Sequence, residues 1–388
     1  MKDEKILFAV FILLSIVLYG CWDDVEIEER AFLSAVAIDL AEDGTNEDAQ
    51  FIEMTEQLVV PAGLSTLTQP GDGKAFRNLS DTGKGVFEIN SKISKQGSRK
   101  LNVEHLGLIV VSREIAETDG MLKNVFDVFI REQYMRRGIL VAVVEGKAKD
   151  ILEVQAEHIM IPAHYVIDLL EKDQSSIAKD PVRIGDIHEK LLTNRSFALP
   201  LISILNDKVL QYEGIAVIAH EPSRMAGSIT GIDAEARHIM IGKGQQSVIT
   251  LPVEGDIATL VIDNSNSKYT LTNQDKQSLA FRIDIDLTAS VKEYYGDLDL
   301  FKKENVEKFR VALENEVKQR AEQVLNMIKD EIQVDMLQID DYLRIHHYRL
   351  WEEIKDDWDY GENLFSQSEI EIHVQVDIMD PGTSTKVN

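Results

Sequence analysis

The chain has 388 residues, and its 67 Asp and Glu residues outnumber its 41 Lys and Arg residues, which gives a formal net charge of −26. A protein this acidic is repelled by nucleic-acid phosphates and by anionic lipid headgroups. We therefore exclude nucleic acid as a partner, and we exclude membrane binding through the protein's own surface charge. The single cysteine permits no intramolecular disulfide, but 44% hydrophobic residues can form sizeable cores, divided among two or three domains at this length.

The N-terminus has the pattern of an export signal. A charged lead, Met1–Lys5, precedes the apolar run Ile6–Tyr19, which spans about 21 Å as a helix and is too short for a bilayer core of about 30 Å. Leu18, Gly20 and Cys21 then stand at positions −3, −1 and +1 of a bacterial lipobox. We predict a lipoprotein signal peptide over residues 1–20, cleaved between Gly20 and Cys21. The alternative is an uncleaved anchor with an incidental buried cysteine.

Cleavage would make Cys21 the mature N-terminus, with its thiol alkylated by diacylglycerol and its amine acylated. Each buried methylene contributes about 0.8 kcal/mol, and stable anchoring takes more than one chain. Residues 21–30 would form a tether, whose candidate partner-facing residues are Trp22, Asp23, Asp24 and Glu26. This segment suits contact at the headgroup level with a basic loop of a partner, and a solvated linker is the alternative. No later stretch has the roughly 18 apolar residues of a transmembrane helix, so we expect the rest of the chain to lie outside the membrane.

Residues 31–195 are predicted to form an N-terminal α/β domain. The predicted strands are Ala31–Leu40, its antiparallel partner Gln50–Val60, Val103–Ser112 and Ile139–Glu145. The predicted helices are Asn78–Lys95, Ser112–Thr118, Met121–Glu132, Ala148–Val154 and Ile184–Leu192. The first helix would be capped by Ser80 or Asp81. The third has an apolar face made of Leu122, Val125, Phe126 and Phe129.

Residues 196–275 are predicted to form a middle β-rich domain. Its strands are Val209–His220, Ser247–Leu251 and Ile257–Asn264, with a helical insert at Ile232–Ile241 and a closing polar turn at Asn264–Lys268.

Residues 276–388 are predicted to form a C-terminal α+β domain. Leu279–Val291 and Ile370–Met379 alternate apolar and polar residues, as strands with one exposed face do, and the first is expected to pair antiparallel. Asn305–Glu331 has apolar residues at steps of three and four. This helix is expected to pack on a sheet, with coiled-coil pairing as the alternative. The predicted fold class is therefore α+β, with several domains, mixed or antiparallel sheets with packed helices, and a long amphipathic helix in the C-terminal domain.

No pattern of catalytic or metal-binding residues is complete in the sequence. His188-Glu189 lacks the second histidine that a zinc-binding helix needs, and the adjacent His346 and His347 point to different sides of a helix or a strand. No nucleophile has an evident base. We therefore predict no enzymatic activity, no metal site and no cofactor beyond the covalent diacylglycerol and N-acyl lipid at Cys21.

Two further pairs of residues are given structural roles. Asp340 and Asp341 are expected to lie on a solvated face. Trp351 and Trp358 are seven residues apart and can share one helical face. We expect both indoles to pack in the core, and a ligand-binding platform is the alternative.

Short patches along nearly the whole mature chain follow the pattern of one family. In the N-terminal half they are Cys21-Trp22-Asp23, Glu26-Ile27, His105, Ser112, Ala116, Arg131-Glu132, Arg136, Gly146 and Ile151-Leu152. In the C-terminal half they are Leu199-Pro200, Tyr212–Val217, Gly227, Gly231, Asp335, Trp351, Trp358 and Gly382. In this order they resemble the Ger(x)C family, the lipoprotein C subunits of spore germinant receptors. Ala35 and Ala37 depart from the glycines that often precede the position of Asp39 in that family.

The resemblance implies three mixed α/β domains on the outer leaflet of the inner spore membrane, beside membrane-embedded A and B subunits. The prediction is a membrane-anchored lipoprotein subunit of a nutrient germinant receptor, needed for spore germination and acting as a non-enzymatic scaffold. The alternative is a solute-binding lipoprotein that delivers a small ligand to a membrane transporter. Such a protein would show two lobes of alternating strands and helices around a cleft, which the alternating strands of the C-terminal third argue against.

Overall fold

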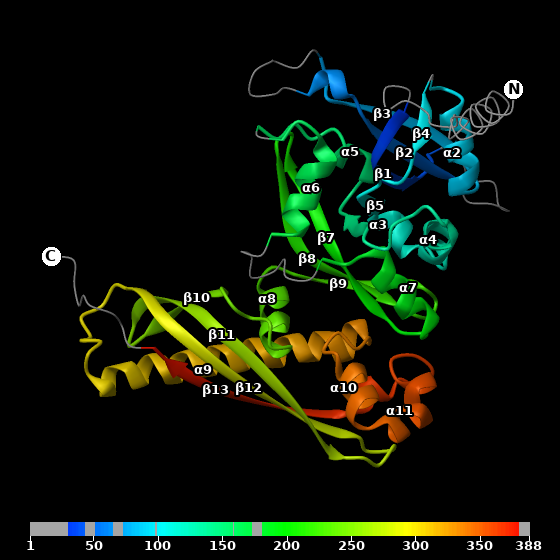
Figure 1. Ribbon diagram of the computed structural model, residues 1–388. Helices are drawn as coiled ribbons and strands as arrows, with labels where there is room; N and C mark the ends of the chain where they lie inside the picture. Colours follow the sequence, from blue (N-terminus) through cyan, green and yellow to red (C-terminus); the bar gives the residue numbers. More distant parts are fainter. Residues whose placement is uncertain are drawn as a thin grey trace, which may run out of the picture.

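The computed structural model describes residues 30–42, 51–64, 73–97, 99–157, 159–172 and 181–379. Within these ranges the chain forms two bodies, each built on one β-sheet, that meet at an angle (Figure 1). The first body comprises residues up to 230 and the second body residues 248–379. A helix between them lies at the junction.

The first body is built on a nine-stranded sheet. Its strands are β1 (Arg30–Leu40), β2 (Ile52–Val59), β3 (Phe76–Gly83), β4 (Lys100–Asn102), β5 (Leu108–Ser112), β6 (Leu140–Val144), β7 (Phe197–Asn206), β8 (Val209–Ala219) and β9 (Arg224–Thr230). They follow the order β3-β2-β1-β5-β6-β7-β8-β9, with β4 also paired to β1. The central strands β1, β5, β6 and β7 run parallel, and the flanking pairs are antiparallel. Every residue of β5 and β6 is buried, because a parallel sheet is covered on both faces.

Helices cover both faces of this sheet. One face packs against α2 (Val86–Ser94), α3 (Arg113–Glu117), α4 (Met121–Arg131) and α7 (Ile184–Leu192). The other face packs against α5 (Ala148–Ile151) and α6 (Pro162–Leu170), and the short turn η2 (Pro61–Gly63) follows β2. Apolar residues at steps of three and four place one buried stripe on each longer helix.

The second body is built on a four-stranded sheet. Its strands are β10 (Val248–Val253), β11 (Asp256–Asn273), β12 (Ala280–Tyr294) and β13 (Glu369–Ile378), in that order. Only β12 and β13 are parallel to each other. The long helix α9 (Lys303–Asn326) runs along the sheet and continues into the π-helical turn η3 (Met327–Ile332) (Figure 1). Four short elements follow: α10 (Ile339–His346), α11 (Tyr348–Ile354), η4 (Lys355–Asp357) and α12 (Leu364–Gln367).

The two bodies share one hydrophobic core at their junction. The helix α8 (Gly231–Met240) follows β9, and its buried side chains pack with Ile215, Val217 and Ile229 of the first body. The same cluster continues into the sheet of the second body and the inner face of α9. The junction is therefore a packed interface.

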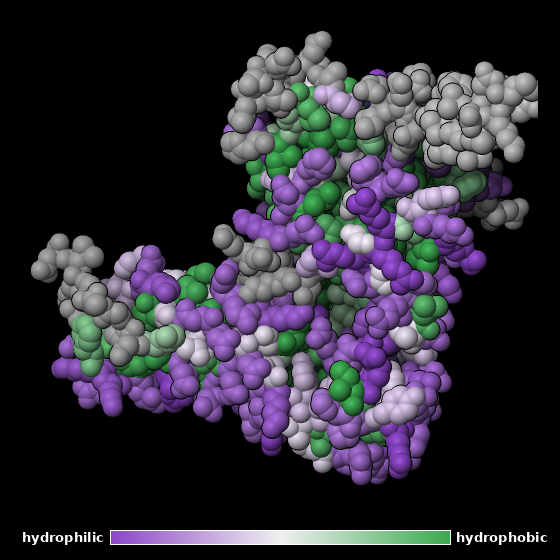
Figure 2. Space-filling model, viewed as in Figure 1, coloured by the Kyte–Doolittle hydropathy of each residue, from purple (hydrophilic) through white to green (hydrophobic). Residues whose placement is uncertain are grey.

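The surface of the two bodies differs in polarity. Polar residues cover most of the visible face of the second body, whereas hydrophobic residues gather around α5 and α6 of the first (Figure 2). Met160 precedes α6, and Leu205 and Val209 flank the turn between β7 and β8; they are 43%, 62% and 39% exposed.

The predicted α+β class, with mixed sheets, packed helices and a long C-terminal helix, is confirmed. The helices predicted at Met121–Glu132 and Ile184–Leu192 correspond to α4 and α7, and the four apolar residues predicted on one face of α4 are its buried residues. The one-sided strands at Leu279–Val291 and Ile370–Met379 correspond to β12 and β13. The long helix packs on the sheet, as expected.

Two predicted elements are wrong. The segment predicted as a helix over Asn78–Lys95 begins with the strand β3, and its helix starts only at Val86. Ser80 lies in β3 and hydrogen-bonds through its hydroxyl to Thr55 of β2, because pairing with β2 outweighs the local capping pattern. The polar turn predicted at Asn264–Lys268 lies inside β11, where a register shift beside Asn264 accommodates it against β12.

The strands of residues 196–275 divide between the two sheets. β7, β8 and β9 belong to the first sheet, and β10 and β11 belong to the second. The predicted domain boundaries at 195 and 275 stay a prediction.

Candidate functional site

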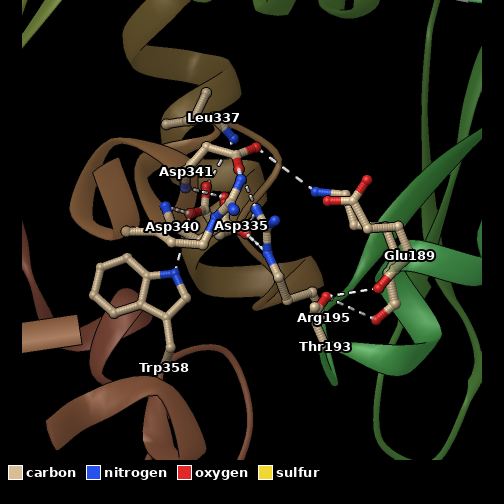
Figure 3. Close-up of polar contacts among 10 residues, drawn as sticks. Glu189, Thr193, Arg195, Asp335, Leu337, Asp340, Asp341 and Trp358 are labelled. Carbon is tan, nitrogen blue, oxygen red and sulfur yellow. Dashed lines mark hydrogen bonds and ion pairs between the residues drawn. The ribbon is translucent and has the colours of Figure 1, made fainter. Parts of the chain in front are cut away.

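The most concentrated group of buried charges in the described residues lies where α7 meets the segment 335–341 of the second body (Figure 3). After α7 ends at Leu192, the chain turns at Asn194, which has a φ of 52°. The backbone N–H of Arg195 then donates to the carbonyl of Lys190 at 3.0 Å. This tight exit directs the Arg195 side chain away from its own sheet and toward the second body.

Arg195 joins the two bodies through a buried ion pair. Its side chain is only 4% exposed, and its Nε donates to Oδ2 of Asp340 at 2.6 Å. Its Nη2 lies 2.7 Å from Oδ1 of Asp341. Asp341 has two further cations nearby, Arg344 at 2.9 Å and Lys190 at 3.6 Å. Charge-assisted bonds of this kind, shielded from water, are strong and directional.

Asp335 positions the acidic residues that Arg195 contacts. Its carboxylate accepts hydrogen bonds from the backbone N–H groups of Leu337 at 2.9 Å and Asp340 at 2.8 Å. It also accepts from Nε1 of Trp358 at 3.0 Å. The carboxylate thereby satisfies unpaired N–H groups at the start of α10, which is the role of a helix cap.

The electrostatics of Asp335 reflect its burial. Burial and the neighbouring Asp340 carboxylate raise the pKa of Asp335 to about 7, although the N–H donors of Asp340 and Trp358 act in the opposite direction. The pKa of Asp341 is lowered: burial alone would raise it, but Lys190 and Arg195 outweigh that effect.

Two hydrogen bonds from the junction fix the backbone between Asp335 and α10. Arg237 of α8 donates through Nε to the carbonyl of Met336 at 2.8 Å. Tyr269 of β11 donates through its hydroxyl to the carbonyl of Leu337 at 2.7 Å. The segment is therefore held from α8, from β11 and from Arg195 at once.

Trp358 lies at the centre of the aromatic core of the second body. Its ring centroid is 6.0 Å from that of Phe281, 6.4 Å from Trp351 and 5.7 Å from Phe365. Trp358 is 1% exposed and Trp351 is 6% exposed. The prediction that both tryptophans pack in the core is confirmed.

A cavity of about 160 Å³ lies beside the ion pair and is lined from both bodies. Its polar lining includes Asp186, Lys190, His238, Asp335 and Asp340. In this cluster Asp340 and Asp341 form ion pairs with Arg195, Lys190 and Arg344, whereas Asp335 accepts hydrogen bonds. The arrangement is suited to fixing one body against the other.

The prediction that Asp340 and Asp341 lie on a solvated face is wrong for Asp340, which is 9% exposed and paired with Arg195. Arg195 itself was given no role by the sequence. The only local signal was an arginine between a helix end and an apolar strand, and it does not identify a partner 145 residues away.

The predicted lipid site and its neighbours lie outside the described residues. These are Gly20, Cys21, Trp22, Asp23, Asp24 and Glu26. Among the helices of the described ranges, none is long and apolar enough to cross a membrane. His188, His346 and His347 do not join any group of three metal-ligating side chains in that part of the chain.

Comparison with known proteins connects this architecture to one family. The chain matches the family model described as "Spore germination protein N-terminal domain" over residues 23–204, and "Spore germination B3/ GerAC like, C-terminal" over residues 213–382. Spore germination protein YndF of Bacillus subtilis (strain 168) is 27% identical over 99% of this chain and 98% of its own length. Spore germination protein A3 of the same organism is 26% identical over 98% of each chain.

A solved structure has the same fold. The crystal structure of the GerBC protein matches with a TM-score of 0.60 at 18% identity, and the match covers 88% of this chain and 97% of that chain. Both halves of the chain, and with them both bodies, are thus accounted for by one family. This protein belongs to the Ger(x)C family of spore germination proteins.

Proposed function

We propose that this protein is the lipid-anchored C subunit of a nutrient germinant receptor and that it serves spore germination as a non-enzymatic scaffold. The observation that carries the proposal is the match of both halves of the chain to spore germination families. The proposed partners are membrane-embedded A and B subunits, and the proposed location is the outer leaflet of the inner spore membrane.

The sequence at the N-terminus supports the anchor. Diacylglycerol on Cys21, together with an N-acyl chain, gives the two-signal attachment that stable membrane binding needs. About ten extended residues, or roughly 30 Å, separate Cys21 from the start of β1. This short tether would keep the first body near the membrane and at high effective concentration for embedded partners.

The junction supports a scaffold over a solute-binding protein. A solute-binding protein closes two lobes around a ligand, so its lobes need an interface that opens. Here the bodies share a continuous core, and Arg195 is buried against Asp340. The cavity at the junction, about 160 Å³, is smaller than the roughly 300–1,000 Å³ of typical ligand pockets.

The anchor is tested with Cys21→Ala in the full chain. We expect the precursor to remain without lipid, to leave the membrane fraction on flotation, and to lose most germination activity. As a matched control, a transmembrane helix replacing residues 1–21 should restore membrane location and germination if tethering is what matters. A Cys21→Ala protein that still floats with membrane and supports normal germination would show that the lipid is not the anchor.

The scaffold role is tested by removal and by calorimetry. Deleting the protein should lower the amount of the A and B subunits in the membrane, because they lose a partner. Calorimetry of the purified chain with candidate amino acids and sugars should show no micromolar binding. Tight binding of a germinant by this subunit alone would favour the solute-binding alternative.

A further inference from the structure

Glu56 is a buried carboxyl group without a partner on one oxygen. It lies in the middle of β2, it is 1% exposed, and its Oε2 accepts no hydrogen bond within the described structure. Its neighbour Gln57 is equally buried but is satisfied, since it donates to the carbonyl of Leu152 at 2.8 Å and accepts from the N–H of Ala163 at 2.9 Å. Buried polar groups are nearly always paired, so the unpaired Oε2 of Glu56 is an exception within β2.

The Glu56 side chain faces a pocket of about 90 Å³ between β1, β2 and the helices α2 and α4. The walls are mostly apolar: Leu33, Val36, Met54, Val86, Phe87, Val103, Val128, Phe129 and Met135. Two other polar residues, Asn90 and Glu132, also line it, and none of its described lining residues is a lysine, arginine or histidine. A carboxyl group therefore lies at the end of an apolar pocket to which the described part of the chain contributes no cation.

Large aromatic side chains stand exposed beside this pocket. Phe87 of α2 lines it and is 67% exposed. Tyr134 is 66% exposed and lies between Glu132 and Met135, two residues of the lining, in the loop after α4. Aromatic residues are enriched in protein interfaces, so this surface has the composition of a docking site.

We propose that this pocket receives a lysine side chain of a membrane-embedded receptor partner, whose ammonium group pairs with Glu56. The inference rests on the proposed receptor function. A lysine stem buries its methylenes against apolar walls while its compact ammonium group reaches a single carboxylate. The acidic subunit, at −26, would also attract a basic partner surface electrostatically.

The raised pKa of Glu56 is that of a buried carboxyl group with no cation beside it. Burial raises the pKa of Glu56 to about 7. An ammonium group beside the carboxylate would lower that pKa, because an opposite charge favours the ionised form. Docking would then release the proton that the empty pocket retains.

The first test uses n-butylammonium as the probe of the pocket, with the full chain in detergent micelles. The ¹³C-methyl NMR signals of Met54 and Met135, which line the pocket, should shift on titration. Uncharged n-butanol, of matched size, should shift them at least about tenfold more weakly. Glu56→Gln should weaken n-butylammonium binding about tenfold or more, whereas Glu88→Gln, an exposed change on α2, should leave it unchanged.

The second test identifies the source of the ammonium group. Glu56→Gln should reduce co-purification of the membrane subunits about tenfold, and n-butylammonium should compete with them for the wild-type chain. The melting temperature of Glu56→Gln, expected at or above that of wild type, separates lost binding from lost folding.

Several outcomes would overturn the inference. Equal binding of the amine and the alcohol, or unchanged methyl signals, would show that the pocket has no preference for a cation. Amine binding with unchanged co-purification of Glu56→Gln would assign the pocket to a free amine instead of a partner's lysine. A wild-type chain that does not co-purify with membrane subunits would instead contradict the proposed receptor function.

Discussion

Replacing Arg195 by methionine should destabilise the protein by about 3 kcal/mol, because it leaves a carboxylate buried without its cation. Breaking a buried ion pair by removing one partner costs roughly 3–5 kcal/mol. Asp341 keeps Lys190 and Arg344 as partners, so its share of the loss is small. Asp340, at 9% exposed, has its closest cation in Arg195 and accounts for most of the effect. We therefore expect a value at the lower end of that range.

Urea unfolding of the full chain, followed by tryptophan fluorescence and by circular dichroism, measures this loss. Arg131→Met is the matched control, since Arg131 pairs with Asp127 on the surface of α4 at 77% and 53% exposed. Exposed pairs contribute about 0–1 kcal/mol, so the control should change stability little.

A double variant tests the cause. Arg195→Met combined with Asp340→Leu replaces the ion pair by apolar groups, and it should recover most of the stability, because such replacements are often neutral. The reasoning fails if Arg195→Met costs no more than Arg131→Met. It also fails if the losses of the two single variants simply add in the double variant, since residues in contact should be coupled.

Three further changes test other buried features. Glu56→Gln should reduce the pH dependence of stability. The raised pKa of Glu56, about 7, makes the folded wild type bind a proton that the unfolded chain releases above about 4.5, so this group lowers wild-type stability by up to about 3 kcal/mol as pH rises from 5 to 8. Urea unfolding at both pH values should show a fall that is smaller by that amount in the variant, because Asp335, whose pKa is also raised, still contributes. Gly214→Ala should lower the melting temperature strongly, because its Cβ would lie 2.1 Å from a carbonyl oxygen of β9, whereas Gly138→Ala, with open space around it, should melt like wild type. Trp358→Phe keeps the aromatic packing but loses the hydrogen bond to Asp335, and calorimetric unfolding should show a loss of about 1–3 kcal/mol; a loss below 0.5 kcal/mol would contradict the structural role given to that bond.

Elements with strong hydrophobic periodicity were predictable from sequence. The apolar runs of β5 and β6 and the stripe of α4 depend on which residues are apolar and at what spacing, and this information is local. The segment that became β3 has weak periodicity, and its strand form depends on pairing with β2. A strand that is stabilised mainly by pairing with its neighbour shows only a weak strand pattern in its own sequence.

The junction could not be predicted in the same way. Arg195 and Asp340 are 145 residues apart, and neither belongs to a sequence motif that predicts their contact. From its sequence, Asp340 is expected on a solvated face, because charged residues are rarely buried without a partner. That rule holds, but the partner comes from the other body. Asp335 did stand out, through the family resemblance, and the structure gives it a physical role as the cap that positions Asp340.

Because several acidic residues are buried, the net charge of this protein does not equal the charge of its surface. A charge of −26 describes an acidic surface only if the carboxylates face water. Asp335 and Asp340 are buried at the junction, and Glu56 is buried in the first body, far along the chain from both. The first two are held by hydrogen bonds and by Arg195, so their cost is offset inside the protein. The Glu56 Oε2 has no hydrogen-bond partner in the described structure, and burial raises the pKa of this carboxyl group to about 7, which favours its neutral form. The lysine that we propose as its partner would supply the missing pairing. Because the junction joins the two bodies through one core, a partner bound at Glu56 on the first body would also fix the position of the second.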